Sequence, residues 1–172
     1  GLLLCQWARH LGARVIGTVG SPAKAELALA HGCHHVIQYG KEDVAARVRS
    51  LTGGEGVPVV FDAVGKDTFE ASLDSLKVRG TLVAFGTASG PTPPFNLFDL
   101  NVRGSLFVTS AGLAWYTRSR AELLQRAAEL IGVVTRGVVK VPVMQKYPLA
   151  DAAEAHRALE GRATTGMTVL LP

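Results

Sequence analysis

The sequence predicts an α/β protein with a doubly wound parallel sheet, and three observations indicate this fold class. Strand-like and helix-like segments alternate along most of the chain, and the connections between them are short and rich in glycine. The strand-like run over residues 57–65 is apolar apart from Asp62, as strands covered on both faces are. Of the 172 residues, 48% are hydrophobic and 19% are charged, which is typical of a globular chain rather than a disordered one.

Local patterns place each element along the chain. The predicted strands are β-branched or apolar runs at residues 13–19, 35–39, 57–65, 80–86 and 104–110. The predicted helices cover residues 1–11, 22–31, 42–54, 67–76 and 122–137. Ser21 and Pro22 suit the N-cap and the first position of the second helix, whereas Gly12 and Gly32 stand where a glycine ends a helix.

The C-terminal part departs from this alternation. After the last long helix, the sequence predicts a strand over residues 138–149, a helix over 151–160 and a strand over 167–171. A strand–helix–strand piece in this position need not belong to the same sheet. We therefore expect a domain boundary near Gly137, which separates residues 1–136 from residues 137–172.

Charge and cysteine content exclude several classes of protein. The net charge of +4 is mild and the basic residues are scattered, which suits an anionic small molecule and makes nucleic acid an unexpected partner. Cys5 and Cys33 are the only cysteines and form no CxxC pair. This excludes a disulfide framework and a four-cysteine zinc lobe, and it fits a reducing compartment, so we expect a cytoplasmic location. No apolar run reaches the ~18 residues of a transmembrane helix, so no membrane partner is expected.

The opening GLLLCQWA resembles a signal peptide only in being apolar. It lacks a basic region and a small-residue cleavage site, and it leads directly into the alternating pattern. It reads as an amphipathic helix whose beginning lies outside the sequence. We therefore expect the sequence to be a fragment.

A ligand site is expected where the strands end. In open α/β sheets, ligands bind beyond the carboxyl ends of the strands, and these ends fall at residues 19–21, 39, 62–65, 85–87 and 109–110. Any one glycine there could do no more than make a turn, but small residues at five strand ends together favour a bound cofactor. The usual GxGxxG between first strand and first helix is not visible, although Gly1 could be its last glycine.

The residues after the predicted strand 13–19 indicate which cofactor this is. An NAD site normally has Asp or Glu about 20 residues beyond the glycine turn, to bind the ribose 2′-hydroxyl. No acidic residue lies between Leu2 and Ala25; Ser21 instead offers a hydroxyl at a helix N-terminus, and Lys24 an ammonium one turn further on. Together these groups suit the 2′-phosphate of NADPH. The alternative is that Ser21 is only a cap and Lys24 only a solvated surface lysine.

The remaining polar and aromatic residues are less informative. His34 and His35 enter a strand without a metal-like partner and are expected to be neutral surface or core histidines. Asp62 could act as a base, but a structural role, accepting backbone N–H bonds, is at least as well supported. Trp115 and Tyr116 are expected to line an interface or a pocket. No nucleophile has a nearby basic partner in the sequence, so covalent catalysis is not expected.

The sequence resembles a known family, the medium-chain dehydrogenase/reductases, and among them the zinc-free quinone oxidoreductases related to ζ-crystallin. The matching stretches are GLLLCQWARHLGARVIGTVGSPAKA, VVFDAVGKDTFEASLDSLKVRGTLVAFGTASGP, NLFDLNVRGSLFVTS and YPLADAAEAHRALEGRATTGMTVLLP. The similarity implies a Rossmann nucleotide-binding domain over residues 1–136, with its first strand and glycine-rich turn missing. Residues 137–172 would be the piece by which the chain returns to a GroES-like catalytic domain.

The resemblance also implies which residues contact NADPH. By similarity these are Gly1, Gly20, Ser21, Lys24, Tyr39, Ala63, Phe85, Gly86, Thr87, Ala88, Ala111, Gly112, Leu113 and Arg162. Lys24 and Tyr39 would flank the 2′-phosphate. Ala63 stands where relatives often have Ser, and Thr87 where they often have Asn, which puts one or two hydrogen bonds to the cofactor in doubt. The catalytic residues are unknown, since the family's quinone pocket belongs to the N-terminal half, which is absent.

The function implied by the resemblance is hydride transfer from NADPH to a quinone, without a metal. Family members are commonly dimers, and we expect a homodimer joined through the strand 104–110. Two alternatives within the same fold stay open: an enone or alkenal reductase, and a non-catalytic nucleotide-binding fragment. A methyltransferase on a similar sheet is disfavoured, because it would normally have an acid where Gly20 and Ser21 stand.

Overall fold

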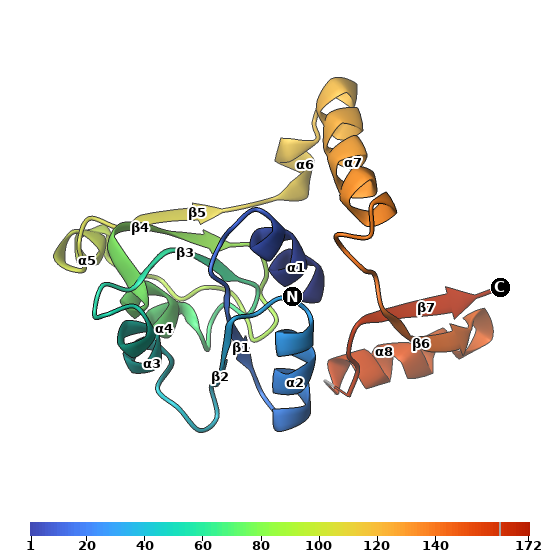
Figure 1. The fold of residues 1–172 in the computed structure, drawn as a ribbon, viewed down its shortest axis with the longest axis horizontal. Helices are drawn as coiled ribbons and strands as arrows, with labels where there is room; N and C mark the ends of the chain where they lie inside the picture. The colour runs from blue at the N-terminus through green and yellow to red at the C-terminus, as the bar shows by residue number, and fades with distance from the viewer. Residues whose placement is uncertain (162) are drawn as a thin grey trace. The chain divides into compact units, whose positions relative to one another are not determined.

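Helices and strands alternate from α1 (Leu2–His10) to β7 (Met167–Leu171) in the computed structural model, which describes residues 1–161 and 163–172 (Figure 1). The mixed α/β class with parallel sheets is confirmed. The chain divides into two compact units: the first contains residues 1–36 and 127–172, and the second contains residues 37–126. Among the described residues, no helix combines the length and the apolar character needed to cross a bilayer.

The first unit contains the two ends of the chain. Its N-terminal part holds α1, β1 (Ile16–Val19), α2 (Pro22–Ala30) and the start of β2 (His35–Gln38), which forms a two-stranded sheet with β1. Its C-terminal part holds most of α7 (Arg120–Thr135), then β6 (Val143–Pro148), η1 (Leu149–Asp151), α8 (Ala152–Glu160) and β7. β6 and β7 run parallel, in a register that pairs Tyr147 with Leu170. The predicted strand–helix–strand piece at the C-terminus therefore has a separate small sheet.

The ends of the first helices follow the predicted cap chemistry. Ser21 has the extended backbone of an N-cap, and its Oγ accepts a hydrogen bond from the amide of Lys24 at 3.3 Å. Gly12 and Gly32, with φ of +85° and +106°, follow α1 and α2 in the left-handed conformation that glycine tolerates best. Gly32 also lies close to α1, because a Cβ there would come within 2.9 Å of the carbonyl oxygen of Cys5. The predicted boundaries of α1 and α2 are confirmed to within a residue or two.

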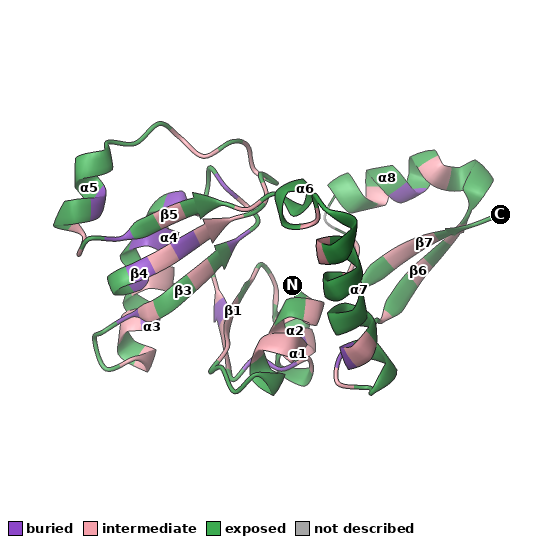
Figure 2. Cartoon of the chain, turned by 90° about the horizontal axis from the view of Figure 1, so that it is seen from above, coloured by how far each residue is buried: buried purple, intermediate pink, exposed green. Residues whose placement is uncertain are grey.

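The second unit is built on one parallel sheet. Its elements are α3 (Val44–Leu51), β3 (Val57–Asp62), α4 (Phe69–Asp74), β4 (Leu76–Ala84), α5 (Leu97–Val102), β5 (Phe107–Ser110) and α6 (Leu113–Tyr116). The strand order is β3-β4-β5, with β4 in the middle. Figure 1 shows these three strands side by side, and Figure 2 shows that buried residues gather on α4 and β4. The core consists of Phe69, Leu73, Leu76, Leu82, Leu100 and Leu106.

β3 differs from the prediction that both of its faces are covered. Val60 packs against the core of the second unit. Val59 and Phe61 point to the opposite side, as alternation along a strand requires, and they remain 41% and 53% exposed. The prediction was therefore wrong for the described chain, because an apolar run indicates what a strand can bury and not what is present to cover it.

Candidate functional site

The three strands of the second unit end at the same level. Asp62 at the end of β3 pairs with Ala84 at the end of β4, and Ala84 pairs with Ser110 at the end of β5. The loops that follow are held to the sheet by backbone bonds. The amide of Phe85 donates to the Asp62 carbonyl, and that of Ala111 donates to the Ala84 carbonyl, both at 2.9 Å. The predicted strand ends at 62, 85 and 110 thus meet at one edge of the sheet.

Two glycines allow these loops to pack closely. A Cβ on Gly86 would lie 2.6 Å from the Ala63 carbonyl oxygen, and a Cβ on Gly65 would lie 2.5 Å from that of Gly90. Gly65 also has a φ of +88°, which glycine adopts without strain. These glycines are therefore required for the packing of the loops. Their effect on a ligand is indirect, because no side chain projects from these two positions at the edge of the sheet.

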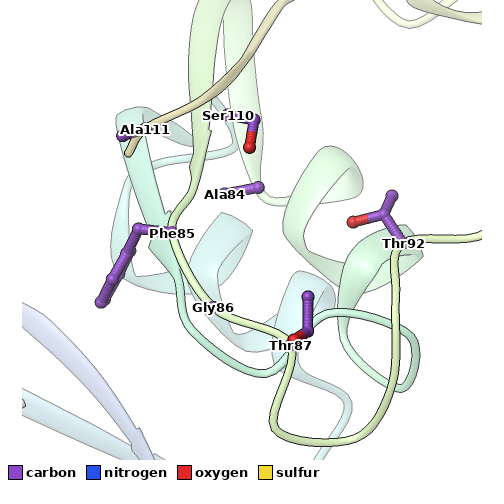
Figure 3. Close-up of a pocket in the computed structure, with 7 residues that line it drawn as sticks. All are labelled: Ala84, Phe85, Gly86, Thr87, Thr92, Ser110 and Ala111. Carbon is purple, nitrogen blue, oxygen red and sulfur yellow. The ribbon is translucent and has the colours of Figure 1, made fainter. Parts of the chain in front are cut away.

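A cavity of about 260 Å³ opens at this edge of the sheet (Figure 3). It is lined by Ala84, Phe85, Gly86, Thr87, Thr92, Ser110 and Ala111. Small side chains and backbone make most of its wall, which leaves room for a flat ring. Hydroxyls come from Thr87, Thr92 and Ser110, and Figure 3 shows the Thr92 hydroxyl pointing toward the side formed by Ala84 and Ser110. None of these three hydroxyls bonds to another residue that the structure describes.

Sequence reasoning missed part of this cavity. Phe85, Gly86, Thr87 and Ala111 were predicted contacts, and the structure brings them together. Ser110 was predicted only as part of a strand end, and Ala84 and Thr92 were not predicted. Thr92 lies in the proline-rich loop between β4 and α5, where no periodicity or motif marks a side chain as functional. Only the return of this loop toward the sheet places its hydroxyl at the cavity.

Asp62 is a structural carboxylate. It is 6% exposed and accepts hydrogen bonds from the amides of Val64 and Gly65, at 2.8 and 3.1 Å, and from the hydroxyls of Thr68 and Ser72, both at 2.8 Å. Burial acts to raise the pKa of Asp62, but these hydrogen bonds outweigh it and hold the pKa below its ordinary value. The carboxylate is therefore ionised, and its hydrogen bonds hold the turn after β3. Of the two roles that the sequence left open for Asp62, the structure supports the structural one.

The remaining predicted contacts of the second unit are accessible. Ala63, Phe85, Ala88, Gly112 and Leu113 are exposed, and Tyr39 after β2 is 49% exposed. Gly112 is the N-cap residue of α6, directly before Leu113. These residues could contact a ligand without rearrangement. Arg162, the contact predicted in the C-terminal piece, lies outside the described residues.

The first unit holds three of the residues predicted near the 2′-phosphate, whereas Tyr39 belongs to the second unit. Gly20 is exposed, and Ser21 and Lys24 are half-buried at the N-terminus of the nine-residue helix α2. The first turn of α2 contains no acidic residue, and the N–H groups and dipole of a helix N-terminus favour an anion. Gly1 is the exposed N-cap residue of α1. Ser21 thus acts as a cap, and nothing in that role prevents it from binding an anion.

His34, His35 and Tyr116 have structural partners. His34 accepts a hydrogen bond from the Val15 amide at 3.0 Å, and His35 contacts the Arg14 guanidinium at 2.8 Å. Tyr116 lies under the Arg126 guanidinium, 5.4 Å from its ring centre, whereas Trp115 is 77% exposed. In the part of the chain that the structure describes, no three His, Cys, Asp or Glu side chains gather as a metal site would require.

Comparison with known proteins adds the family context. Residues 1–130 match a domain family described as zinc-binding dehydrogenase. The quinone oxidoreductase of Salmonella typhimurium is 51% identical over 100% of this chain and 53% of its own length. A 2-haloacrylate reductase of Burkholderia sp is 48% identical over 100% of this chain and 52% of its own length.

A solved structure supports the same grouping. The crystal structure of Escherichia coli quinone oxidoreductase complexed with NADPH superposes with a TM-score of 0.96 at 49% identity, over 100% of this chain and 53% of that one. The chain therefore spans about half the length of the relatives it matches.

Proposed function

The chain belongs to the zinc-binding dehydrogenase family, and on this premise we propose that it is the nucleotide-binding part of an NADPH-dependent quinone oxidoreductase. The observation that carries the proposal is the common level of the three strand ends, with a cavity of small residues and hydroxyls directly beyond them. Similarity to an Escherichia coli quinone oxidoreductase complexed with NADPH supports it.

The residues of the second unit suit the nicotinamide end of NADPH. Gly86 and Ala111 leave space for a flat ring against the backbone, and Thr87, Thr92 and Ser110 offer hydroxyls to an amide substituent. When bound, NADPH would supply the hydride. The role of this chain is to hold the ring in one orientation with one face open to an acceptor, so that donor and acceptor meet at a fixed distance.

The N-terminus of α2, in the first unit, suits a phosphate. We propose that Gly20, Ser21 and Lys24 contact the 2′-phosphate, because the N-terminus of α2 provides N–H groups and a hydroxyl, and its first turn contains a lysine and no acidic residue. Tyr39 is proposed to contact the same phosphate. Gly1 is proposed to belong to the turn that binds the pyrophosphate.

The domain arrangement stays a proposal as well. We propose that residues 1–136 belong to the nucleotide-binding domain and that residues 137–172, with Arg162, return to a GroES-like catalytic domain. Two observations support a boundary near Gly137: this residue follows α7 with a φ of +71°, and β6 and β7 form a sheet of their own. We propose that the rest of that domain, with the catalytic residues, belongs to the part of the relatives that this chain does not span.

Assembly, location and metal use are proposed on similar grounds. β5 is an edge strand of its sheet, and Phe107 on it is 60% exposed. An apolar edge of this kind favours pairing with a second copy, so a homodimer through strand 104–110 is proposed. Two cysteines without a disulfide framework support a cytoplasmic location. A metal-free reaction is proposed from the resemblance to the zinc-free quinone oxidoreductases.

One specific observation favours a second candidate function. A 2-haloacrylate reductase is almost as similar to this chain as the quinone oxidoreductases are. The cofactor-binding half does not determine which acceptor is reduced. A reductase of activated alkenes, such as enones, is therefore the alternative.

The test uses the full-length protein that contains this chain. NADPH oxidation is followed with a benzoquinone, an enone and a 2-haloacrylate at equal concentrations, with and without a metal chelator. The proposal expects the highest kcat/KM with the quinone and no effect of the chelator. Faster reduction of the enone or the haloacrylate would establish the alternative, and failure to bind NADPH in a fluorescence titration would refute both.

A further inference from the structure

We propose that Cys5 and Cys33 are a redox-sensitive pair, which a hydroperoxide converts into a disulfide that joins α1 to the turn after α2. The two cysteines are 28 positions apart in the sequence, and the structure brings their Sγ atoms to 3.5 Å. They are the only cysteines in the chain, and both are free thiols. A disulfide requires the sulfurs to approach by a further ~1.5 Å, to the bonded distance of about 2 Å.

The packing around the two sulfur atoms holds them close together. Gly17 on β1 leaves space for Cys33, since a Cβ at position 17 would lie 2.7 Å from its Sγ. Gly32 allows the turn to lie against α1, since a Cβ there would lie 2.9 Å from the Cys5 carbonyl oxygen. Two close approaches therefore bring the thiols together without a cross-link. Both cysteines belong to the first unit.

The two thiols have different environments, which suggests a different role for each. Cys5 is half-buried and accessible to a small oxidant, whereas Cys33 is 3% exposed. Cys33 donates its S–H to the Cys5 sulfur, and this hydrogen bond lowers the pKa of Cys5 to about 7. Donating this hydrogen bond raises the pKa of Cys33 above its ordinary range. Cys5 is therefore the attacking thiolate, and Cys33 the thiol that resolves the product.

The reaction balances with a hydroperoxide as the oxidant. The Cys5 thiolate attacks one peroxide oxygen, the O–O bond breaks, and a sulfenic acid forms while the other oxygen leaves as water or an alcohol. The Cys33 sulfur then displaces the hydroxyl from Cys5, forming the S–S bond and releasing water. Two electrons pass from the two thiols to the peroxide. A dithiol returns the pair to the reduced state.

The disulfide would close a loop that contains an exposed part of the chain. The loop that it closes, residues 5–33, contains β1 and α2, and it therefore includes the exposed N-terminus of α2. Oxidation would restrict this loop by fixing its two ends to each other. The proposal does not depend on what binds at α2.

The test is peptide mapping of the full-length protein after treatment with hydrogen peroxide, followed by alkylation of free thiols. The expected product is a peptide pair joined through Cys5 and Cys33 with the loss of two hydrogen atoms, recovered from a band of single-chain mass and separated by dithiothreitol. In Cys33→Ser, Cys5 should instead gain oxygen, because no resolving thiol is present. In Cys5→Ser, Cys33 should stay a thiol, because it is buried.

Three outcomes would overturn the proposal. Both thiols could remain unchanged in the wild-type protein, Cys5 could gain oxygen there without cross-linking, or the joined peptides could come only from a band of doubled mass. The wild-type map decides between these outcomes and the proposal even if a variant fails to fold.

Discussion

Asp62 shows how a single residue organises the edge of the sheet. Its carboxylate accepts four hydrogen bonds from the turn after β3 and from α4. The charge lies where a base could stand, but the four donors occupy its lone pairs. Its effect is therefore to fix the turn that begins with Ala63, a residue proposed to contact NADPH.

Replacement of Asp62 tests this structural role. Asp62→Asn should lower the free energy of unfolding at pH 7 by about 1–3 kcal/mol, because one acceptor oxygen becomes a donor facing donors. The pKa of Asp62 is lowered by folding, so its stabilisation is fully present above the unfolded pKa of about 3.9 and is lost as the pH falls through the lower folded value. Denaturant unfolding at a series of pH values should show the two proteins converging below that point. Asp67→Asn, an exposed carboxylate in the same turn, is the control and should change little.

Lys24 is proposed to give the preference for NADPH over NADH. Lys24→Ala removes a charge-assisted hydrogen bond worth about 1.5–3 kcal/mol, so the affinity for NADPH should fall by about one to two orders of magnitude. NADH has no 2′-phosphate and should bind almost unchanged. Tyr39→Phe should show a smaller loss in the same direction.

The measurement for Lys24 is a titration of both cofactors into the full-length protein at one salt concentration. Lys77→Ala removes the same charge at the amino end of β4 and serves as the control. An equal loss of affinity for NADH and NADPH in the Lys24 variant would show that the phosphate assignment is wrong. An unchanged affinity for both would leave Lys24 as a surface lysine.

At the scale of the elements, the loop after β4 depends on its contact with the loop after β3. Gly86 allows the contact, because any Cβ there would meet the backbone of Ala63. The amide of Ala88 also donates to the Ala63 carbonyl, at 3.2 Å. The cavity between β4, β5 and this loop therefore exists because two loops meet without side chains between them.

Gly86→Ala tests this close approach. The added methyl group would lie 2.6 Å from a backbone oxygen, so one loop must shift, with a loss of stability of about 1–3 kcal/mol. The cavity should change with it, and the affinity for NADPH should fall about tenfold or more, a loss of ~1.4 kcal/mol. Gly40→Ala is the matched control, since a Cβ there would meet nothing within 4 Å. Equal NADPH affinities for the two variants in calorimetry would argue against a cofactor at this loop.

At the scale of the molecule, the chain spans about half the length of its relatives. Hydride transfer depends on holding donor and acceptor together, an effect worth about 7–11 kcal/mol. Residues 1–172 alone should therefore reduce quinones at a negligible rate, whereas the full-length protein should be active without added metal. The check is a comparison of turnover at equal concentrations after the mass of each sample is verified. Comparable rates would contradict the proposed role of the remaining half.

The exposed edge of β5 leads to a prediction about assembly. The full-length protein should have the mass of a dimer in light scattering at micromolar concentration. Phe107→Glu should shift it toward the monomer, because two like charges would face each other near the symmetry axis. Phe98→Glu, an equally exposed phenylalanine on α5, should leave the dimer intact. A monomeric wild-type protein would exclude pairing through this strand.

The sequence by itself determined the α/β class, the order of most elements and their boundaries at caps and glycines. These features depend on neighbouring residues: Ser21 caps α2 through the amide of Lys24, and Gly12 and Gly32 end helices through their own backbone angles. The sequence also predicted that Phe85, Gly86 and Thr87 lie at the edge of the sheet, because they follow the end of a parallel strand and ligands bind at that edge.

Only the tertiary structure decided which distant residues meet. The four donors around Asp62, the Thr92 hydroxyl at the cavity and the 3.5 Å contact of Cys5 with Cys33 have no signal in the sequence. Each depends on sheet register, on the return of a loop or on the packing of a helix against a turn. Those contacts are set by the combined packing of many side chains, whereas a cap or a turn is set by a few consecutive residues.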